Sequence, residues 1–176
     1  RVGSSVYDLA NGNDGTFNGD VTRINFLGTG LNFSGTASYA DTGTNASLDS
    51  LSELTTHAWI KLDTTGTIQH IVQKDAVMDL KIGSSNQIIF SIGDGSVFGT
   101  ECNSTQTVEV NKWYSIASSY SDIKDEIKIY IDGELDTTCS GITTIMGTNS
   151  NNRKIGSNSG GSENLDGFIS EVSIGG

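Results

Sequence analysis

Proline is absent from the 176 residues of this chain. Without proline, the turns depend on Gly, Asn and Asp, which tolerate a positive φ or form Asx turns. The chain holds 22 glycines, and Gly, Asn and Asp gather between short segments of alternating apolar and polar residues. This composition predicts many short strands joined by polar turns, and it argues against long helices.

Long apolar runs and an excess of positive charge are missing as well. No run approaches the about 20 apolar residues that a membrane-spanning helix requires, so no membrane insertion is expected. The chain has 10 Lys and Arg against 21 Asp and Glu, which gives a net charge of −11 at pH 7. A field of this sign repels phosphate backbones, and nucleic acid is therefore excluded as an expected partner. No signal-peptide pattern stands at Arg1, so we expect a mature or excised fragment.

Cysteine is scarce, with Cys102 and Cys139 as the two examples. Neither belongs to a CxxC pair or stands beside a histidine, so metal or redox chemistry is not expected at these residues. Both lie in polar segments that flank predicted strands, and we expect them to form a structural disulfide. A disulfide indicates an oxidising compartment, so the expected location is extracellular or at the surface of a cell or virion.

Alternation along the chain defines the clearest strands. In residues 54–62 the even-numbered side chains share one face, and His57 and Trp59 lie on the other. Residues 113–136 predict a strand, a turn and a second strand that ends in a tight turn at Asp132-Gly133. Residues 147–165 are rich in Asn, Ser and Gly and predict a mobile loop, with a short strand piece at Lys154-Ile155. Turn signals every ~8–12 residues predict a sandwich or barrel formed by a single domain.

Five segments, in order along the chain, carry a family resemblance. They are Asp8–Thr16, Leu31–Thr36 with Tyr39, Leu54–Lys61, Lys112–Ala117 with Ile129–Gly133, and Leu165–Val172. Together they resemble the LamG-like jelly-roll domains of the concanavalin A-like lectin/glucanase superfamily, which includes laminin G domains and pentraxins. The resemblance implies an all-β, two-sheet antiparallel jelly-roll sandwich over residues 1–176. Ser170 departs from the pattern, because the family motif places an aspartate there.

The superfamily also contains glycosidases, which carry two carboxylates on one strand face for the acid and nucleophile roles. The acidic residues of this chain do not follow that pattern. Asp122, Asp125 and Glu126 lie in a predicted turn, and Asp132 and Glu134 flank another. The histidines, His57 and His70, have no serine or cysteine in a nucleophile motif. We therefore predict that the chain is not an enzyme.

The acidic opening loop suggests a calcium site, and Ca²⁺ is the predicted cofactor. Hard cations bind carboxylate, amide and carbonyl oxygens held in a loop, and two glycines here permit tight geometry. In related domains this loop lies beside the closing strand, where Glu171 or Asp166 would add a carboxylate. The alternative is an Asx-rich turn that hydrogen-bonds to itself. The predicted metal ligands are Asp8, Asn11, Asn13, Asp14 and Glu171.

Two surfaces are candidates for ligand binding. The first is a sheet face, predicted to be concave, that carries His57, Trp59 and Tyr130. The alternative for Trp59, and for Trp113 on the same face, is packing in the core or under a loop. The second surface is the rim formed by the loops at 93–104 and 147–165, with the polar candidates Asp94, Asn149, Asn151, Asn152 and Arg153.

These observations lead to one principal functional hypothesis and two alternatives. The first is a non-catalytic extracellular recognition module that binds a carbohydrate or glycoprotein in adhesion, as part of a larger surface protein or assembly. The second is a structural subunit of an extracellular filament, surface layer or virion, with calcium-supported self-association. The third is a glycosidase, which the missing carboxylate pair disfavours.

Overall fold

The computed structural model describes residues 5–7, 9, 12–25 and 29–176 of the chain. In this part, the only helix is one 3₁₀ turn, η1 (Ala46–Leu48), and all other regular structure is strand. The described strands are β1 (Ser5–Val6), β2 (Gly15–Asn18), β3 (Val21–Asn25), β4 (Thr29–Ser34), β5 (Tyr39–Asp41), β6 (Glu53–Leu62), β7 (Gln69–Lys74), β8 (Met78–Ile82), β9 (Gln87–Ile92), β10 (Cys102–Thr107), β11 (Trp113–Ser121), β12 (Glu126–Ile131), β13 (Glu134–Ser140), β14 (Arg153–Ile155) and β15 (Asp166–Gly175).

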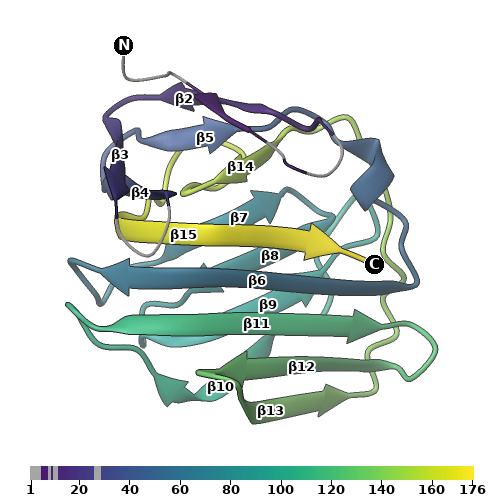
Figure 1. Cartoon of the computed structure of the whole chain (residues 1–176). Helices are drawn as coiled ribbons and strands as arrows, with labels where there is room; N and C mark the ends of the chain where they lie inside the picture. The colour runs from purple at the N-terminus through teal and green to yellow at the C-terminus, as the bar shows by residue number, and fades with distance from the viewer. Residues whose placement is uncertain (1–4, 8, 10–11, 26–28) are drawn as a thin grey trace.

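The described strands form two antiparallel sheets stacked face to face. The eight-stranded sheet has the order β1-β2-β5-β14-β7-β8-β9-β10, and the seven-stranded sheet has the order β13-β12-β11-β6-β15-β4-β3. In Figure 1, β15, β6, β11, β12 and β13 lie side by side in front of β7, β8 and β9. The predicted all-β jelly-roll sandwich is therefore confirmed.

The periodicity of β6, β11 and β12 explains why these segments form strands. In each of them, fully buried residues alternate with partly exposed ones, because one face of the seven-stranded sheet meets the other sheet and the opposite face meets solvent. β6 pairs with β11 from Glu53 to Lys61 without a shift in register. The face predicted for the even-numbered residues of β6 is the buried one.

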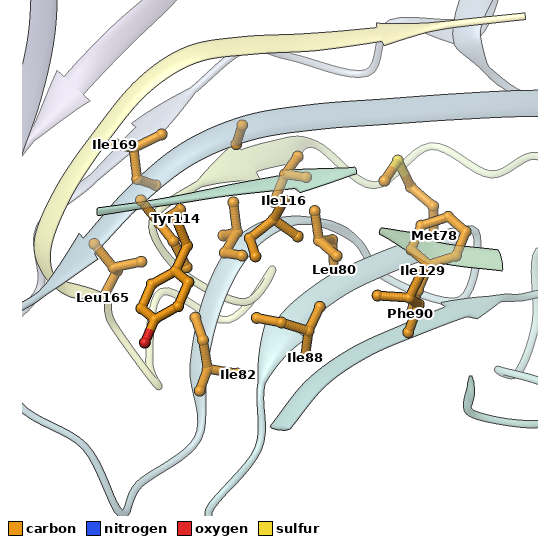
Figure 2. Close-up of a cluster of buried hydrophobic side chains, with 14 of the residues drawn as sticks. Met78, Leu80, Ile82, Ile88, Phe90, Tyr114, Ile116, Ile129, Leu165 and Ile169 are labelled. Carbon is orange, nitrogen blue, oxygen red and sulfur yellow. The ribbon is translucent and has the colours of Figure 1, made fainter. Parts of the chain in front are cut away.

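The core lies between the two sheets and is built from aliphatic and aromatic side chains of both. Figure 2 shows Met78, Leu80 and Phe90 of the eight-stranded sheet packed with Ile116 and Ile129 of the seven-stranded sheet. All five are fully buried. Burial of a side chain of this size contributes about 1.5–3 kcal/mol, so this layer is the main source of stability.

One edge of the sandwich is closed covalently. Cys102 of β10 and Cys139 of β13 form a disulfide with a Cα–Cα distance of 5.8 Å, which confirms the predicted pairing. Beside it, the Asp136 carboxylate accepts hydrogen bonds from the backbone N–H groups of Thr105 and Gln106. β10 and β13 are edge strands of different sheets, so these contacts join the two layers along that edge.

The short strand predicted at Lys154-Ile155, within the Asn-, Ser- and Gly-rich residues 147–165, is confirmed as β14. It inserts into the eight-stranded sheet between β5 and β7. The segment after it, residues 156–165, is tied to β7 by backbone bonds from Gly156 to Ile71 and from His70 to Glu163. This covering segment contacts His70 and Gln73, and Lys74 is buried against Thr44 and Asp49 of the loop around η1. All six residues of β7 are buried.

Candidate functional site

Five aromatic side chains lie on the outer face of the seven-stranded sheet, the face turned toward the viewer in Figure 1. We call this group the aromatic face. Alternation places them there, because the sequence neighbours of each aromatic residue either point into the core or belong to a turn. The group consists of His57, Trp59, Trp113, Tyr130 and Phe168.

The strand register brings these rings together. Phe168, Lys61 and Trp113 stand opposite one another on β15, β6 and β11, and the Trp113 and Phe168 ring centroids are 6.2 Å apart. His57 and Trp59 make an edge contact with centroids 6.5 Å apart. His57 and Lys61 are four positions apart on β6, which corresponds to ~14 Å along the strand.

Small residues leave the rings accessible. Trp59 stands between Ser170 and Ser115, and Ala117 separates His57 from Tyr130 in the register. All five aromatic residues are partly exposed, and the tryptophans do not belong to the core cluster between the sheets. The prediction that His57, Trp59 and Tyr130 share a sheet face is therefore confirmed, while their contact with a ligand stays a prediction.

Polar groups are interspersed with the rings. The Lys61 ammonium lies 4.6 Å from the centroid of the Phe168 ring, within the range of a cation–π contact. His57 Nε2 and Ser115 Oγ are hydrogen-bonded at 3.0 Å. Aromatic faces next to hydrogen-bonding groups suit a ligand that is itself amphipathic, with one apolar face and polar edges.

The rim candidates mostly stabilise their own turns. Asp94 accepts hydrogen bonds from the N–H groups of Val97 and Ser96, and these bonds lower the pKa of its carboxyl. Asn149 donates to the carbonyls of Asp75 and Gly95. Asn152 donates to Asp41, whereas Asn151 is exposed and bonds through its backbone N–H to Asn149. A ligand-binding role of Asp94 and Asn151 stays a prediction.

The placement of Arg153 at an exposed loop rim is wrong. Arg153 belongs to β14 and is 1% exposed. Its guanidinium and the Lys74 ammonium both contact the Asp49 carboxylate, which is also buried. Burial lowers the pKa of Arg153, and the charge and hydrogen bond of Asp49 oppose that effect. Its role in the fold is to anchor the loop around η1, because its Nη atoms donate to the carbonyls of Asn45 and Leu48.

Sequence reasoning missed a chain of charged groups on the eight-stranded sheet. His70 lies between two carboxylates, with Nδ1 2.7 Å from Asp79 Oδ1 and Nε2 2.8 Å from Glu163 Oε2. Lys81 continues the chain to Asp79 and Glu101. Burial disfavours the charged imidazole, but the hydrogen bonds and charges of Asp79 and Glu163 outweigh it, so the pKa of His70 is raised above 6.5. No local pattern in the sequence links these positions.

The predicted calcium site lies partly outside the described residues, which do not include Asp8 or Asn11. Glu171 is exposed at the irregularity in the pairing of β15 with β6, where its φ is 54°. In the described part of the chain, no group of three or more His, Cys, Asp or Glu side chains is arranged to hold a metal ion. Calcium binding by Asn13, Asp14 and Glu171 with the other two ligands therefore stays a prediction.

Comparison with known proteins gives a family and several structural neighbours. Residues 34–175 match the family model described as the concanavalin A-like lectin/glucanases superfamily. A search of curated proteins found no match. Within the described residues, no helix has the length and hydropathy that a bilayer crossing requires.

Three solved structures illustrate the structural likeness. The botulinum neurotoxin serotype G binding domain has a TM-score of 0.72 and 14% identity, over 95% of this chain and 44% of that one. The serotype D ligand binding domain in complex with N-acetylneuraminic acid has a TM-score of 0.70 and 15% identity, over 97% and 47%. Domain 4 of AbnA, an extracellular arabinanase from Geobacillus stearothermophilus, in complex with arabinotriose, has a TM-score of 0.66 and 15% identity, over 89% and 75%. The chain thus spans less than half of either toxin domain, and at these identities the likeness concerns the fold.

Proposed function

Because the chain belongs to the concanavalin A-like lectin/glucanases superfamily, we propose that it is a non-catalytic carbohydrate-binding module that binds glycan on the aromatic face. The observation that carries the proposal is the gathering of five partly exposed rings on the solvent side of one sheet. A fold of this kind hosts several functions, so the argument depends on the surface itself. Solved neighbours in complex with arabinotriose and with N-acetylneuraminic acid support the ligand class.

The aromatic face suits an extended glycan. The rings spread ~14 Å along β6 and over four neighbouring strands, which gives room for more than one sugar ring. Sugar rings have apolar C–H faces that pack on Trp59 and Trp113, and their hydroxyls reach His57, Ser115 and Lys61. The surface is rigid because it is formed by the central strands of a sheet, and a preformed site loses little conformational entropy on binding.

The charge of the molecule favours a neutral ligand. The net charge of −11 disfavours approach of strongly anionic polysaccharides. On the aromatic face, the Lys128 ammonium is paired with Glu126 at 2.6 Å, so Lys61 is the main cationic group beside the rings. A neutral glycan, or one with a single carboxylate near Lys61, fits this surface best.

The extracellular setting is a further part of the proposal. The Cys102–Cys139 disulfide supports it, because disulfides persist in oxidising compartments. The proposal also includes a role in adhesion, as one module of a larger surface protein.

The experiment is a glycan array with neutral and sialylated oligosaccharides, arabinotriose included, followed by calorimetric titration of the best binder. We expect Trp59→Ala to weaken that binding at least about tenfold, the loss typical of a central aromatic contact. Thr55→Ala is the matched control, because Thr55 lies on the same face of β6 but beyond the rings. An array without any binder, or equal affinity for Trp59→Ala and wild type, would contradict the proposal.

A further inference from the structure

A depression lies away from the aromatic face. It is shallow and open, with a volume of about 550 Å³. Its lining residues lie in connections next to the end of β6 and the start of β15, two strand ends that are at the left of Figure 1. Three connections line it: the turn after β4, the loop between β6 and β7, and the covering segment before β15. The lining residues are Gly35, Thr67, Ile68, Gly161, Ser162, Glu163 and Asn164.

Glu163 is the charged residue of this depression. Its side chain is 44% exposed, and its Oε2 accepts hydrogen bonds from His70 Nε2 at 2.8 Å and Asn158 Nδ2 at 3.1 Å. Both bonds end on the same oxygen, and Oε1 takes part in neither. The backbone of Glu163 has a φ of 51°, in the left-handed region.

The groups behind Glu163 hold its carboxylate in place. His70 is 2% exposed and is fixed from the other side by Asp79, which is 1% exposed. Lys81 and Glu101 complete the chain of charges. An acceptor that is already oriented by buried partners loses less side-chain entropy when a ligand binds.

The same arrangement indicates the chemistry of the ligand. Glu163 is paired with His70, which also contacts Asp79, and the described residues contain no group of carboxylates suited to a metal ion. The depression therefore offers hydrogen-bond acceptors, of which the Glu163 carboxylate is the charged one. Thr67 adds a hydroxyl group, whereas the hydroxyl of Ser162 is hydrogen-bonded to Asn158. Ile68, which is 37% exposed, adds an apolar surface.

We propose that this depression is a second carbohydrate site, separate from the aromatic face, that takes one ring of a neutral sugar. Sugar hydroxyls donate to Glu163 Oε1 and exchange hydrogen bonds with the hydroxyl of Thr67, while the C–H face of the ring packs on Ile68. The site takes a single ring because the depression is shallow and bounded by three connections, whereas the aromatic face takes an extended chain. It belongs to the class of ligand in the proposed function but uses none of the same residues.

The test is nuclear magnetic resonance of the ¹⁵N-labelled chain titrated with the methyl glycosides of glucose, galactose, mannose and arabinose. We expect at least one glycoside to shift the amide signals of residues 161–164 with a millimolar dissociation constant. Glu163→Gln keeps the shape of the side chain and should weaken this binding at least about tenfold, because charge-assisted hydrogen bonds are about twice as strong as neutral ones. Thr67→Val, which leaves His70 untouched, should weaken it as well.

Glu101→Gln is the matched control. It removes the same charge from the other end of the same chain of groups, outside the depression, and should bind like the wild type. The inference is overturned if none of the four glycosides shifts these amides at about 50 mM, well above a millimolar constant, or if Glu163→Gln and Thr67→Val both bind as tightly as the wild type. Because signals of β6 and β11 are followed in the same spectra, failure of this site and failure of the aromatic face are separate results.

Discussion

At the scale of single residues, the buried charges are what the sequence conceals most. His70 and Lys74 belong to β7, and both are buried and bound to carboxylates more than eight residues away. Such partners are chosen by the three-dimensional fold, and no spacing in the chain reveals them. The aromatic residues of β6 were predictable, because an alternating strand with one apolar face directs the other face to solvent.

His70 should make the stability depend on pH above about 6.5, the pKa of the unfolded state. Its pKa is raised in the folded protein, so its contribution is fully present below the unfolded pKa of about 6.5 and is lost as the pH rises through the folded pKa. We expect the urea midpoint of the wild type to fall over that rise, and His70→Gln to be less stable by about 1–3 kcal/mol at about pH 6 with a flatter profile. His57→Gln, on the outer face, serves as the control. Parallel profiles for His70→Gln and wild type would refute this assignment.

Asp49 should be more important for stability than an exposed acid. It is the carboxylate shared by Lys74 and Arg153, and its removal leaves two buried cations without a counter-charge. We expect Asp49→Asn to lower the free energy of unfolding by about 3–5 kcal/mol. Glu101→Gln, whose ion pair with Lys81 is largely exposed on the glutamate side, should cost at most about 1 kcal/mol. Urea unfolding of the two variants measures the contrast, and similar losses would contradict it.

At the scale of elements, predictability follows burial. β6, β11 and β12 were predicted because only one of their faces is buried, which leaves an alternating pattern in the sequence. β14 was predicted only as a short strand piece at Lys154-Ile155, because its polar flanks resemble a loop and its two charged residues are buried by tertiary contacts. Its pairing with β5 and β7 makes it part of the sheet. The depression beside Glu163 was not predicted, because it arises where three separate connections meet.

The edge formed by β10 and β13 should depend on its disulfide. The bond joins residues 37 positions apart, and the chain-entropy model assigns a loop of this length about 4 kcal/mol. We expect Cys102→Ala combined with Cys139→Ala to lose about 3–4 kcal/mol of unfolding free energy. Addition of a reductant should destabilise the wild type by a comparable amount and leave the double variant unchanged. A wild type that is insensitive to full reduction would show that the edge is held by its hydrogen bonds alone.

At the scale of the whole molecule, the two proposed glycan surfaces use different parts of the same sandwich. The aromatic face is formed by the central strands β15, β6, β11 and β12, whereas the depression is formed by connections at one end of the sheets. A surface built on strands is set by register, and register follows from the hydrophobic pattern. A surface built on connections varies with their length and residues, as is usual for sites carried by loops on a rigid scaffold.

The charge of the molecule and its protected edge also bear on self-association, which the alternative of a structural subunit requires. At β10 the side chain of Asp136 accepts two backbone N–H groups that would otherwise be open to a partner strand, and the disulfide holds β13 beside it. The net charge of −11 adds repulsion between copies.

We therefore expect a monomer in size-exclusion chromatography with light scattering, both with calcium and after treatment with a chelator. Salt screens the repulsion between copies but does not remove the edge protection. If the edge protection is sufficient by itself, the protein stays monomeric at about 1 M salt as well as at about 0.15 M. Polymers that form when calcium is added would instead favour the structural subunit, and they would make the acidic loops the place where copies meet.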